Sequence, residues 1–405
     1  EISGAHFRQE GQISYGNTIV VHPTNANHVL CGGVDLHRTT DGGTTWTKVT
    51  KWNADRGTPH YAHADHHCLV MPAAAPGRVY DPNDGGLDVS ENGGDTWVNR
   101  SNGLAVTMFY DMDVAQSDGG ARGGGAQDNG TVVTASGRSD DFFELLGGDG
   151  GWIVYDPKAA TRVFASYYNI HLFRFDKGAY ADVSPPCSDA ERNAVWMAFV
   201  LLDPGDAKTV LCGSSRLWRS TNSGGSWKPV SPAFDGSSIS CIEVALTDSK
   251  RIYVGTENGG VFRTTDGAKT WSPNLSGGLL PGHAITRLAS SPVNPDRVYV
   301  TVANFGHSHV FASSDGCRTW QDIDKGQLPD VPHHAIAIPR TAPDTIYVCN
   351  DVGVYASADA GKTWSDMSRN LPHVMIVDLA YHEADKTLSA ASYGRSMWRI
   401  HTTAL

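Results

Sequence analysis

Apolar positions along this chain come in short runs of about four to seven residues, separated by Gly, Pro, Asn and Asp. Turn signals of this kind recur about every 8–12 residues, a spacing typical of all-β sandwiches, barrels and propellers. No amphipathic stretch with a helical period interrupts the runs. The pattern therefore predicts an all-β protein of many short strands.

One eight-residue phrase, Ser/Thr-x-Asp/Asn-x-Gly-x-Thr-Trp or a close variant, follows a short apolar strand six times. The copies are Thr39–Trp46, Ser90–Trp97, Ser220–Trp227, Thr264–Trp271, Ser313–Trp320 and Ser357–Trp364. The third residue can accept backbone N–H bonds, a neighbouring Gly supplies a positive φ, and the Trp can pack against its surroundings. The repeated phrase therefore predicts a hairpin connector sealed by a tryptophan.

The tryptophans of successive copies lie 51, 130, 44, 49 and 44 positions apart. The interval of 130 equals three periods of about 43, which predicts two further repeat units without the phrase. Their strands are predicted at Met108–Val114, Ala126–Asn129, Thr131–Ala135 and Phe142–Leu146, and at Trp152–Tyr155, Val163–Tyr168, His171–Phe175 and Ala179–Val183. After the last copy only three strands follow, Ile376–Tyr381, Leu388–Ala391 and Ser396–His401.

The repeated phrase resembles the Asp-box (BNR) repeat of sialidases, sortilin-type propellers and xyloglucan-cleaving glycoside hydrolases. In those families the box joins the two outer strands of a propeller blade. The resemblance implies a single β-propeller domain of four-stranded blades over residues 1–405. We predict nine blades, with eight as the alternative, and a strand at Ala5–Gln9 that closes the ring by pairing with the C-terminal strand.

Composition and charge narrow the range of partners. Gly 44, Pro 20 and Trp 11 suit a propeller, and no apolar run reaches the ~18 residues of a membrane span. A net charge of −11 without a Lys/Arg stripe argues against nucleic acid as a partner.

Because the chain starts at Glu1, and because of the resemblance, we expect a secreted or periplasmic protein. Cys31, Cys212 and Cys349 hold the same strand position in three blades, too far apart to pair, and cysteine usage leaves the compartment open.

Carboxylates recur in the loops that we expect on the face opposite the repeated phrase. Asp35, Asp84, Asp128 and Asp149 are the candidate catalytic residues, because glycoside hydrolysis needs two carboxylates about 5–5.5 Å or 6.5–9.5 Å apart. The candidate substrate-binding residues of the same face are His60, Tyr61, His63, Asn129, Glu257, His307, Asp351, Tyr393 and Arg395. The alternative for each Asp-Gly tip is a turn that caps its own backbone.

The segment from His60 to His67 is unusually rich in His. In an extended conformation His63, Asp65 and His67 would point to one side and His66 to the other. These four residues are therefore a candidate site for a divalent metal, the one cofactor that the sequence suggests. The alternative is a hydrogen-bonded His/Asp cluster between blades.

The resemblance also bears on the reaction. Gly33–Arg38 is similar to the first-blade loop of the xyloglucan-cleaving family, whose catalytic Asp matches Asp35, although the family's following Gly-Gly is Leu36-His37 here. In that family the site lies between two propellers. Asn83–Gly86 and Asn350–Gly353 are closer to the family motif in form. The resemblance implies a glycoside hydrolase that acts on a polysaccharide or glycan.

Two other classes remain open. One is a lyase or metal-dependent enzyme, in which Tyr393, Arg395 and a His of the same face act as acid, carboxylate neutraliser and base. The other is a propeller that binds glycan or protein without chemistry. An enzyme predicts a close carboxylate pair in a cleft, one of them with a raised pKa, whereas a binder predicts exposed aromatic platforms and solvated carboxylates. Sialidase chemistry is disfavoured, since no Arg triad is evident.

Overall fold

The computed structural model describes residues 14–192, 194–278 and 280–404, and it divides the chain into two compact units. Unit 1 comprises residues 1–106 and unit 2 residues 107–405. The helices of the described part are α1 (Asp189–Arg192) and the 3₁₀ turn η1 (Thr402–Ala404), and neither is long and apolar enough to cross a membrane. The all-β prediction is confirmed, whereas one domain over residues 1–405 stays a prediction.

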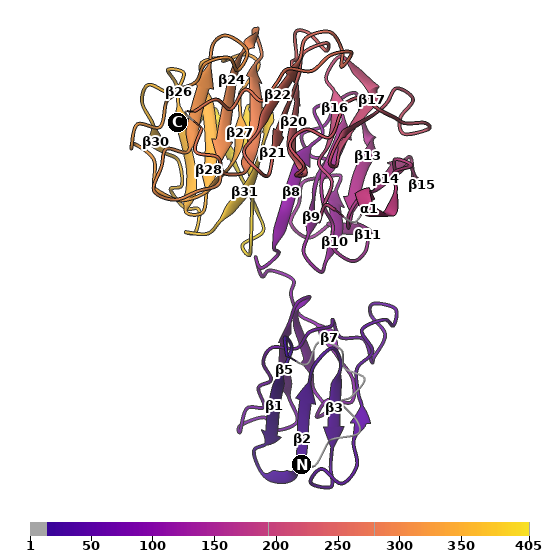
Figure 1. Ribbon diagram of the computed structural model, residues 1–405. Helices are drawn as coiled ribbons and strands as arrows, with labels where there is room; N and C mark the ends of the chain where they lie inside the picture. The colour runs from indigo at the N-terminus through magenta and orange to yellow at the C-terminus, as the bar shows by residue number, and fades with distance from the viewer. Residues whose placement is uncertain (1–13, 193, 279, 405) are drawn as a thin grey trace. The chain divides into compact units, whose positions relative to one another are not determined.

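The described residues of unit 1, from residue 14 onward, form two antiparallel sheets, whose strands Figure 1 shows. Their strands are β1 (Thr18–His22), β2 (Asn25–Gly32), β3 (Leu36–Thr39) and β4 (Thr47–Lys48), then β5 (Val79–Asn83), β6 (Gly86–Ser90) and β7 (Val98–Asn99). Isolated bridges from His66 to Asn83 and from Val70 to Tyr80 place a further segment beside β5. Leu30, Leu36 and Trp97 belong to the buried core of this unit.

Unit 2 contains seven antiparallel sheets among the residues that the structure describes. The first three are β8 (Phe109–Val114), β9 (Arg122–Ala126), β10 (Gly130–Thr134) and β11 (Phe143–Leu146); β12 (Ile153–Asp156), β13 (Ala159–Tyr167), β14 (His171–Asp176) and β15 (Ala179–Asp182); and β16 (Val200–Asp203), β17 (Asp206–Gly213), β18 (Leu217–Ser220) and β19 (Lys228–Pro229). The other four are β20 (Ile239–Val244), β21 (Ile252–Thr256) and β22 (Val261–Thr264); β23 (Ile285–Ser291), β24 (Asn294–Val302), β25 (Val310–Ser313) and β26 (Gln321–Asp322); β27 (His333–Ala337), β28 (Ile346–Asn350), β29 (Gly353–Ser357) and β30 (Ser365–Asp366); and β31 (Ile376–His382), β32 (Thr387–Ser392) and β33 (Met397–His401).

The first strands of these seven sheets contact one another in chain order, from β8 through β12, β16, β20, β23 and β27 to β31. The last of them, β31, in turn packs against β8, which lies beside it in Figure 1. Asp378 of β31 accepts a hydrogen bond from the Met112 backbone at 3.3 Å, and Met108 forms a bridge with Tyr393. The first and last sheets of unit 2 are therefore neighbours.

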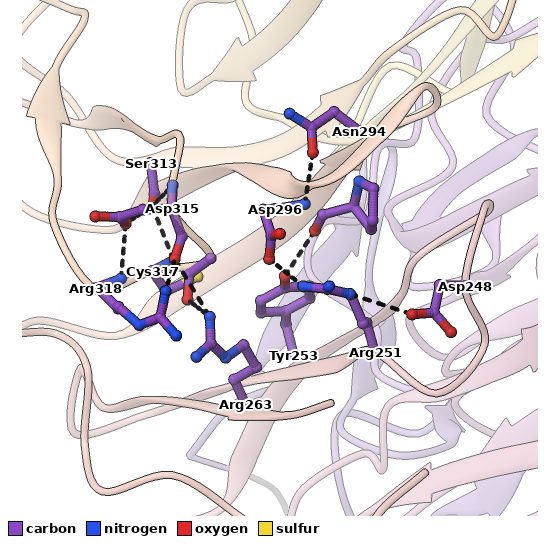
Figure 2. Close-up of polar contacts among 12 residues, drawn as sticks. Asp248, Arg251, Tyr253, Arg263, Asn294, Asp296, Ser313, Asp315, Cys317 and Arg318 are labelled. Atoms are coloured by element: carbon purple, nitrogen blue, oxygen red, sulfur yellow. Dashed lines mark hydrogen bonds and ion pairs between the residues drawn. The ribbon is translucent and has the colours of Figure 1, made fainter. Parts of the chain in front are cut away.

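The repeated phrase forms the tight turn that the sequence predicts, as the copy Ser313–Trp320 illustrates; Figure 2 shows Ser313, Asp315, Cys317 and Arg318 of this copy. The Ser313 hydroxyl accepts the Cys317 N–H at 2.8 Å and donates to Asp315 at 2.9 Å, and Asp315 Oδ1 accepts the N–H groups of Arg318 and Thr319 at 3.0 and 2.9 Å. Both the fourth and the fifth residue have positive φ, even where the fifth is Ala268 or Cys317. The turn therefore tolerates a non-glycine residue in the left-handed region, at a local conformational cost.

The tryptophan of the repeated phrase also contacts the preceding sheet. In unit 2 each indole N–H donates to a carbonyl at or beyond the end of that sheet's last strand, over 2.7–2.9 Å: Trp227 to Val183, Trp271 to Val230, Trp320 to Leu275 and Trp364 to Ile323. Arg219 and Arg263 in turn donate to backbone carbonyls of the next turn, those of Gly267 and Gly316. The predicted sealing role is confirmed, whereas the arginine contacts were not anticipated.

One predicted strand differs from the structure, and another lies outside the described residues. The second strand of the first phrase-free sheet is β9, Arg122–Ala126, instead of Ala126–Asn129, because the strand includes three consecutive glycines. A Cβ on Gly125 would lie 1.9 Å from the Gly151 carbonyl oxygen, so close packing requires glycine there. The expected closing strand Ala5–Gln9 lies outside the described residues.

The cysteines agree with their predicted positions. Cys31, Cys212 and Cys349 lie in β2, β17 and β28, the second strand of three different sheets. All seven cysteines of the chain are free thiols.

Candidate functional site

A cavity of about 270 Å³ opens in unit 2 at the start of its first strands. We call it the mouth cavity and define it by Tyr110, Asp111, Trp152, Trp196 and Glu257, which line it. Glu257 comes from the loop after β21, and Tyr110 and Asp111 come from β8. The cavity therefore lies at the end of unit 2 where the loops between second and third strands emerge, as the sequence predicts for a site.

Aromatic side chains form one wall of this region. Trp196 is 59% exposed, and its ring centroid lies 5.4 Å from that of Tyr168, which in turn contacts Tyr167 at 4.2 Å. Tyr110 lies 5.9 Å from Tyr393 between ring centroids. An exposed indole beside a cavity costs hydrophobic free energy in the empty protein, so it is suited to contact a ligand.

Four of the predicted site residues come together beside this wall. Asp149 Oδ1 accepts the Asp128 backbone N–H at 2.7 Å, and the Asn129 amide donates to the Gln127 carbonyl at 3.0 Å. The Tyr393 hydroxyl donates to the Gln127 side chain. Asp149 is buried, and burial together with a hydrogen bond to Asp149 raises the pKa of Tyr168. Asp128 and Asp149 are thus neighbours, and hydrogen bonds from the Asp128 backbone and from Tyr168 hold the Asp149 carboxylate.

A second pair of carboxylates was missed by the sequence analysis. Asp111 of β8 and Asp378 of β31 are 2% and 5% exposed and are hydrogen-bonded to each other. Asp111 Oδ2 accepts the Ile153 N–H at 2.8 Å, and Asp378 forms an ion pair with Arg287 of β23. Burial, followed by the charge of Asp378, raises the pKa of Asp111 well above its usual value. Burial therefore disfavours the charged form of Asp111.

Arg287 joins this pair to the aromatic floor of the cavity. Its guanidinium carbon lies 4.8 Å from the Trp152 ring centroid and 5.5 Å from that of Phe199. The cation is held between carboxylate and aromatic faces, a geometry that stabilises guanidinium away from water. The only signal for this cluster in the sequence is a carboxylate or an arginine at an otherwise apolar strand position.

The predicted catalytic residues Asp35 and Asp84 belong to unit 1. Asp35 is 2% exposed, and its carboxylate contacts Lys48 Nζ at 2.6 Å, the Trp52 N–H at 2.9 Å and the Thr50 hydroxyl at 3.2 Å. These contacts favour a structural role for Asp35. Asp84 Oδ1 lies 2.7 Å from His67 Nε2, and Asp84 Oδ2 accepts the Tyr15 hydroxyl at 3.2 Å.

The extended conformation expected for His63–His67 is wrong at Asp65, which has a φ of 62°. The alternation of side chains is therefore lost. His66 is fully buried, with Nδ1 2.8 Å from Asp81, and His63 Nδ1 lies 3.2 Å from the Ala64 carbonyl. In the described part of the chain no group of three or more His, Cys, Asp or Glu could hold a metal ion. These contacts fit the alternative of a hydrogen-bonded cluster, in which burial and then the charge of Asp84 raise the pKa of Asp65, and the metal site stays a prediction.

The remaining candidate substrate-binding residues lie in loops. The contacts that the structure describes for them do not bring them together around one cavity. The His60 carbonyl accepts the Lys51 N–H at 2.8 Å, and the Tyr61 N–H donates to Thr58 at 3.0 Å. The other contacts are His307 with His283 at 6.4 Å between centroids, Asp351 with His334 at 2.7 Å, and the Arg395 N–H with Ser392 at 3.0 Å. Their part in a site stays a prediction.

Comparison with known proteins supports the propeller class. The Sortilin-Vps10 family, described as "Sortilin, neurotensin receptor 3", matches residues 215–326. A curated relative, xyloglucanase Xgh74A of Acetivibrio thermocellus, is 28% identical over 211 residues, which cover 41% of this chain and 24% of the relative. The chain thus spans about a quarter of the length of that relative.

Two solved structures resemble the chain. The extracellular domain of the putative hybrid two component system BT3049 from B. thetaiotaomicron has a TM-score of 0.58 at 12% identity, with 95% of this chain and 51% of that one covered. A GH74 enzyme from Niastella koreensis has a TM-score of 0.44 at 15% identity, with 96% and 73% covered. The fold is therefore all-β with propeller-like neighbours.

Proposed function

We propose that this chain is a carbohydrate-active propeller protein that binds a polysaccharide or glycan at the mouth cavity of unit 2. The observation that carries the proposal is the exposed Trp196 indole beside a cavity lined by Tyr110, Trp152 and Glu257. An apolar ring face with a few convergent polar groups is the usual composition of a small-ligand site. The similarity to a xyloglucanase over part of the chain supports a polysaccharide as the ligand.

A second candidate function is hydrolysis of the bound glycan. It is favoured by Asp111, a buried carboxylic acid with a raised pKa that lines the cavity and is paired with Asp378. A protonated carboxyl group of this kind can act as a general acid. Asp128 and Asp149, which lie next to each other, are the alternative carboxylates. A lyase is less supported, because the hydroxyl of Tyr393, its candidate acid, donates a hydrogen bond to the Gln127 side chain.

Within the same proposal, the seven sheets of unit 2 form one closed ring. The support is the contact of β31 with β8, made by Asp378, Met112, Met108 and Tyr393. A closed ring leaves no open sheet faces between first and last blades. The proposal thus counts seven blades in unit 2 and leaves the two described sheets of unit 1 apart, whereas the sequence predicts a single ring of nine blades, or alternatively eight. We also propose a secreted or periplasmic location, as the extracellular neighbour suggests.

The test is a binding screen of the purified protein on neutral and acidic polysaccharides, followed by a reducing-sugar assay on each ligand found. We expect binding that Trp196→Ala weakens at least about tenfold, because a buried aromatic contact is a typical binding hot spot. If the chain is a hydrolase, Asp111→Asn abolishes sugar release while binding persists. Loss of turnover in Asp84→Asn instead would place the chemistry in unit 1, and no binding to any polysaccharide would refute the proposal.

A further inference from the structure

A second cavity of unit 2 lies at the other end of its first strands. It has a volume of about 310 Å³, and we call it the Glu243 cavity. Six of its lining residues define it: Val154, Leu201, Glu243, Ala289, Ser290 and Ile336. Further lining residues come directly after β12, β16 and β23, namely Pro157, Pro204 and Pro292. The mouth cavity lies at the start of the first strands, so the two cavities are separate sites.

Strand register shows that Glu243 occupies a position that is apolar in the neighbouring sheets. On the first strands, the residues at this position are Leu201, Glu243 and Ala289, which pair with Leu211, Tyr253 and Tyr299. These second-strand residues pair in turn with the residues just before the repeated phrase, Arg219, Arg263 and Ala312. A carboxylic acid therefore stands where the sheets on either side have Leu and Ala.

A second acid at the matching strand position, Asp113, makes different contacts. Asp113 and Glu243 each stand one residue before the end of their first strands, β8 and β20. The two oxygens of Asp113 accept the N–H groups of Val114 and Tyr155, each at 2.8 Å. Its carboxyl group is therefore satisfied by the fold on both sides.

Glu243, in contrast, uses one oxygen. Its Oε1 accepts the Ser290 N–H at 2.9 Å and the Ser290 hydroxyl at 2.6 Å. Its Oε2 accepts no hydrogen bond from the residues that the structure describes, and it is accessible to solvent. Because Glu243 lines the cavity, Oε2 can accept a hydrogen bond from a molecule bound there.

The charges around the cavity favour a cation as that molecule. The other titratable or charged lining residues are Tyr155, Asp203 and Arg340. Arg340 is exposed, so solvent screens its charge, whereas Asp203 is 8% exposed. Arg287, the cation whose charge reaches Glu243 from β23, is already paired with Asp378. Burial raises the pKa of Glu243 to about 7, and a cation in the cavity would favour its charged form.

We propose that the Glu243 cavity binds a small primary amine with a compact aliphatic body. The ammonium group donates a hydrogen bond to Glu243 Oε2, and the body packs against Val154, Leu201 and Ala289. A volume of about 310 Å³ is at the lower end of the range for small-ligand pockets, which suits a compact ligand. Of the lining residues only Tyr155 is aromatic, so the cavity lacks the aromatic cage that recognises a quaternary ammonium.

The direct test uses cyclohexylamine, which is an ammonium ion at pH 7, in titration calorimetry with the purified protein in phosphate and in MOPS buffer. We expect one site per chain and the release of about half a proton per amine bound, since the pKa of Glu243 is about 7 before binding. Cyclohexanol lacks the charge and tetramethylammonium lacks N–H donors, so each should bind at least about tenfold more weakly. Equal binding of either compound, or no binding of cyclohexylamine, overturns the proposal.

Two protein variants and a matched control locate the site. Glu243→Gln keeps an acceptor for Ser290 but removes the charge, and it should weaken cyclohexylamine binding at least about tenfold without lowering the thermal midpoint. Ala289→Leu introduces the side chain that Leu201 has at the same register, so it should reduce binding by filling the cavity. Asp113→Asn should leave the affinity unchanged. Affinity unchanged in Glu243→Gln or in Ala289→Leu, or lost equally in Asp113→Asn, contradicts the proposal.

The same ammonium chemistry could come from a lysine side chain of another protein. Nα-acetyl-lysine methylamide carries that side chain between two peptide groups, and its bulk beyond the aliphatic chain does not suit a compact cavity. It should therefore bind more weakly than cyclohexylamine in the same calorimetric assay. Tighter binding of the lysine compound would assign the cavity to a partner's lysine and overturn its assignment to a small amine.

Discussion

Glu243 provides a sharp test of how charge is buried among the first strands of unit 2. It lies on β20, lines a cavity of about 310 Å³, and its Oε1 accepts both the Ser290 N–H at 2.9 Å and the Ser290 hydroxyl at 2.6 Å. Burial raises the pKa of Glu243 from 4.5 to about 7. Because both hydrogen bonds end on one oxygen, Glu243→Gln can keep them while it removes the titration.

The sign of the effect follows from proton binding. With a raised pKa the folded state holds the proton to higher pH than the unfolded state, so stability falls as pH rises from 4.5 to about 7 and is level above that. Raising the pKa from 4.5 to about 7 corresponds to about 3 kcal/mol, an upper figure because solvent reaches the cavity. Burial also raises the pKa of Asp113 to about 7. Asp113 contributes equally to the pH dependence of the wild type and of Glu243→Gln, so its contribution cancels in their difference.

The assay is thermal unfolding of the wild type and of Glu243→Gln between pH 4.5 and 8.5. Their midpoints should coincide near pH 4.5, and the variant should gain up to about 6 °C by pH 8, at about 2 °C per kcal/mol for a unit of this size. Ser290→Ala, which removes one donor to the carboxylate, should move the decline in stability to higher pH. A difference between wild type and Glu243→Gln that is constant across pH refutes the assignment of a buried, titrating carboxyl group.

Three further predictions concern the repeated turn. Ala360→Gly should stabilise the protein by about 1 kcal/mol, because Ala360 has a φ of 65°. Gly361→Ala should destabilise it, because the added Cβ would lie 2.5 Å from Ile323 Cδ1. Thermal midpoints that move in the opposite directions would contradict this prediction. Trp364→Ala should cost about 3–5 kcal/mol in urea unfolding, and a loss under ~1 kcal/mol would show that the indole is not a packing element. Hydrogen bonds from the Thr363 backbone and hydroxyl lower the pKa of Asp359 to about 2, so the stability lost in Asp359→Ala should be present above pH 4 and vanish as pH falls through about 2; an unchanged difference at pH 2 would exclude this role.

The all-β class and the repeated turns could be predicted from the sequence because their signals are local. The copy Ser313–Trp320 contains its own acceptor, its own left-handed positions and its own sealing indole, so the turn can be recognised without tertiary information. The spacing of 130 between Trp97 and Trp227 correctly indicated the sheets β8–β11 and β12–β15. The Gly123–Gly125 strand was missed because a glycine run is usually a loop, and only the backbone of Gly151 against it explains why glycine is needed.

The site was less predictable because its contacts join distant segments. Asp35 matched the catalytic Asp of the family motif only in part, and its ion-pair partner Lys48 comes from a later strand. Asp111 was read as part of an apolar strand, since its partners Asp378 and Arg287 lie far along the chain. Asp128 and Asp149, in contrast, are 21 residues apart in sequence, about half of one repeat, and the structure brings them into contact; that such loop tips gather on one face stays a prediction.

The central claim, that the mouth cavity of unit 2 holds a sugar, is tested most directly by titration calorimetry with an oligosaccharide from the best-binding polysaccharide. Trp196→Ala should weaken binding by about 30-fold, equivalent to ~2 kcal/mol for a central aromatic contact. Trp52→Ala is the matched control, since Trp52 is a comparably exposed indole of unit 1, at 52% against 59%. Affinity unchanged in Trp196→Ala, or lost equally in Trp52→Ala, would contradict the account.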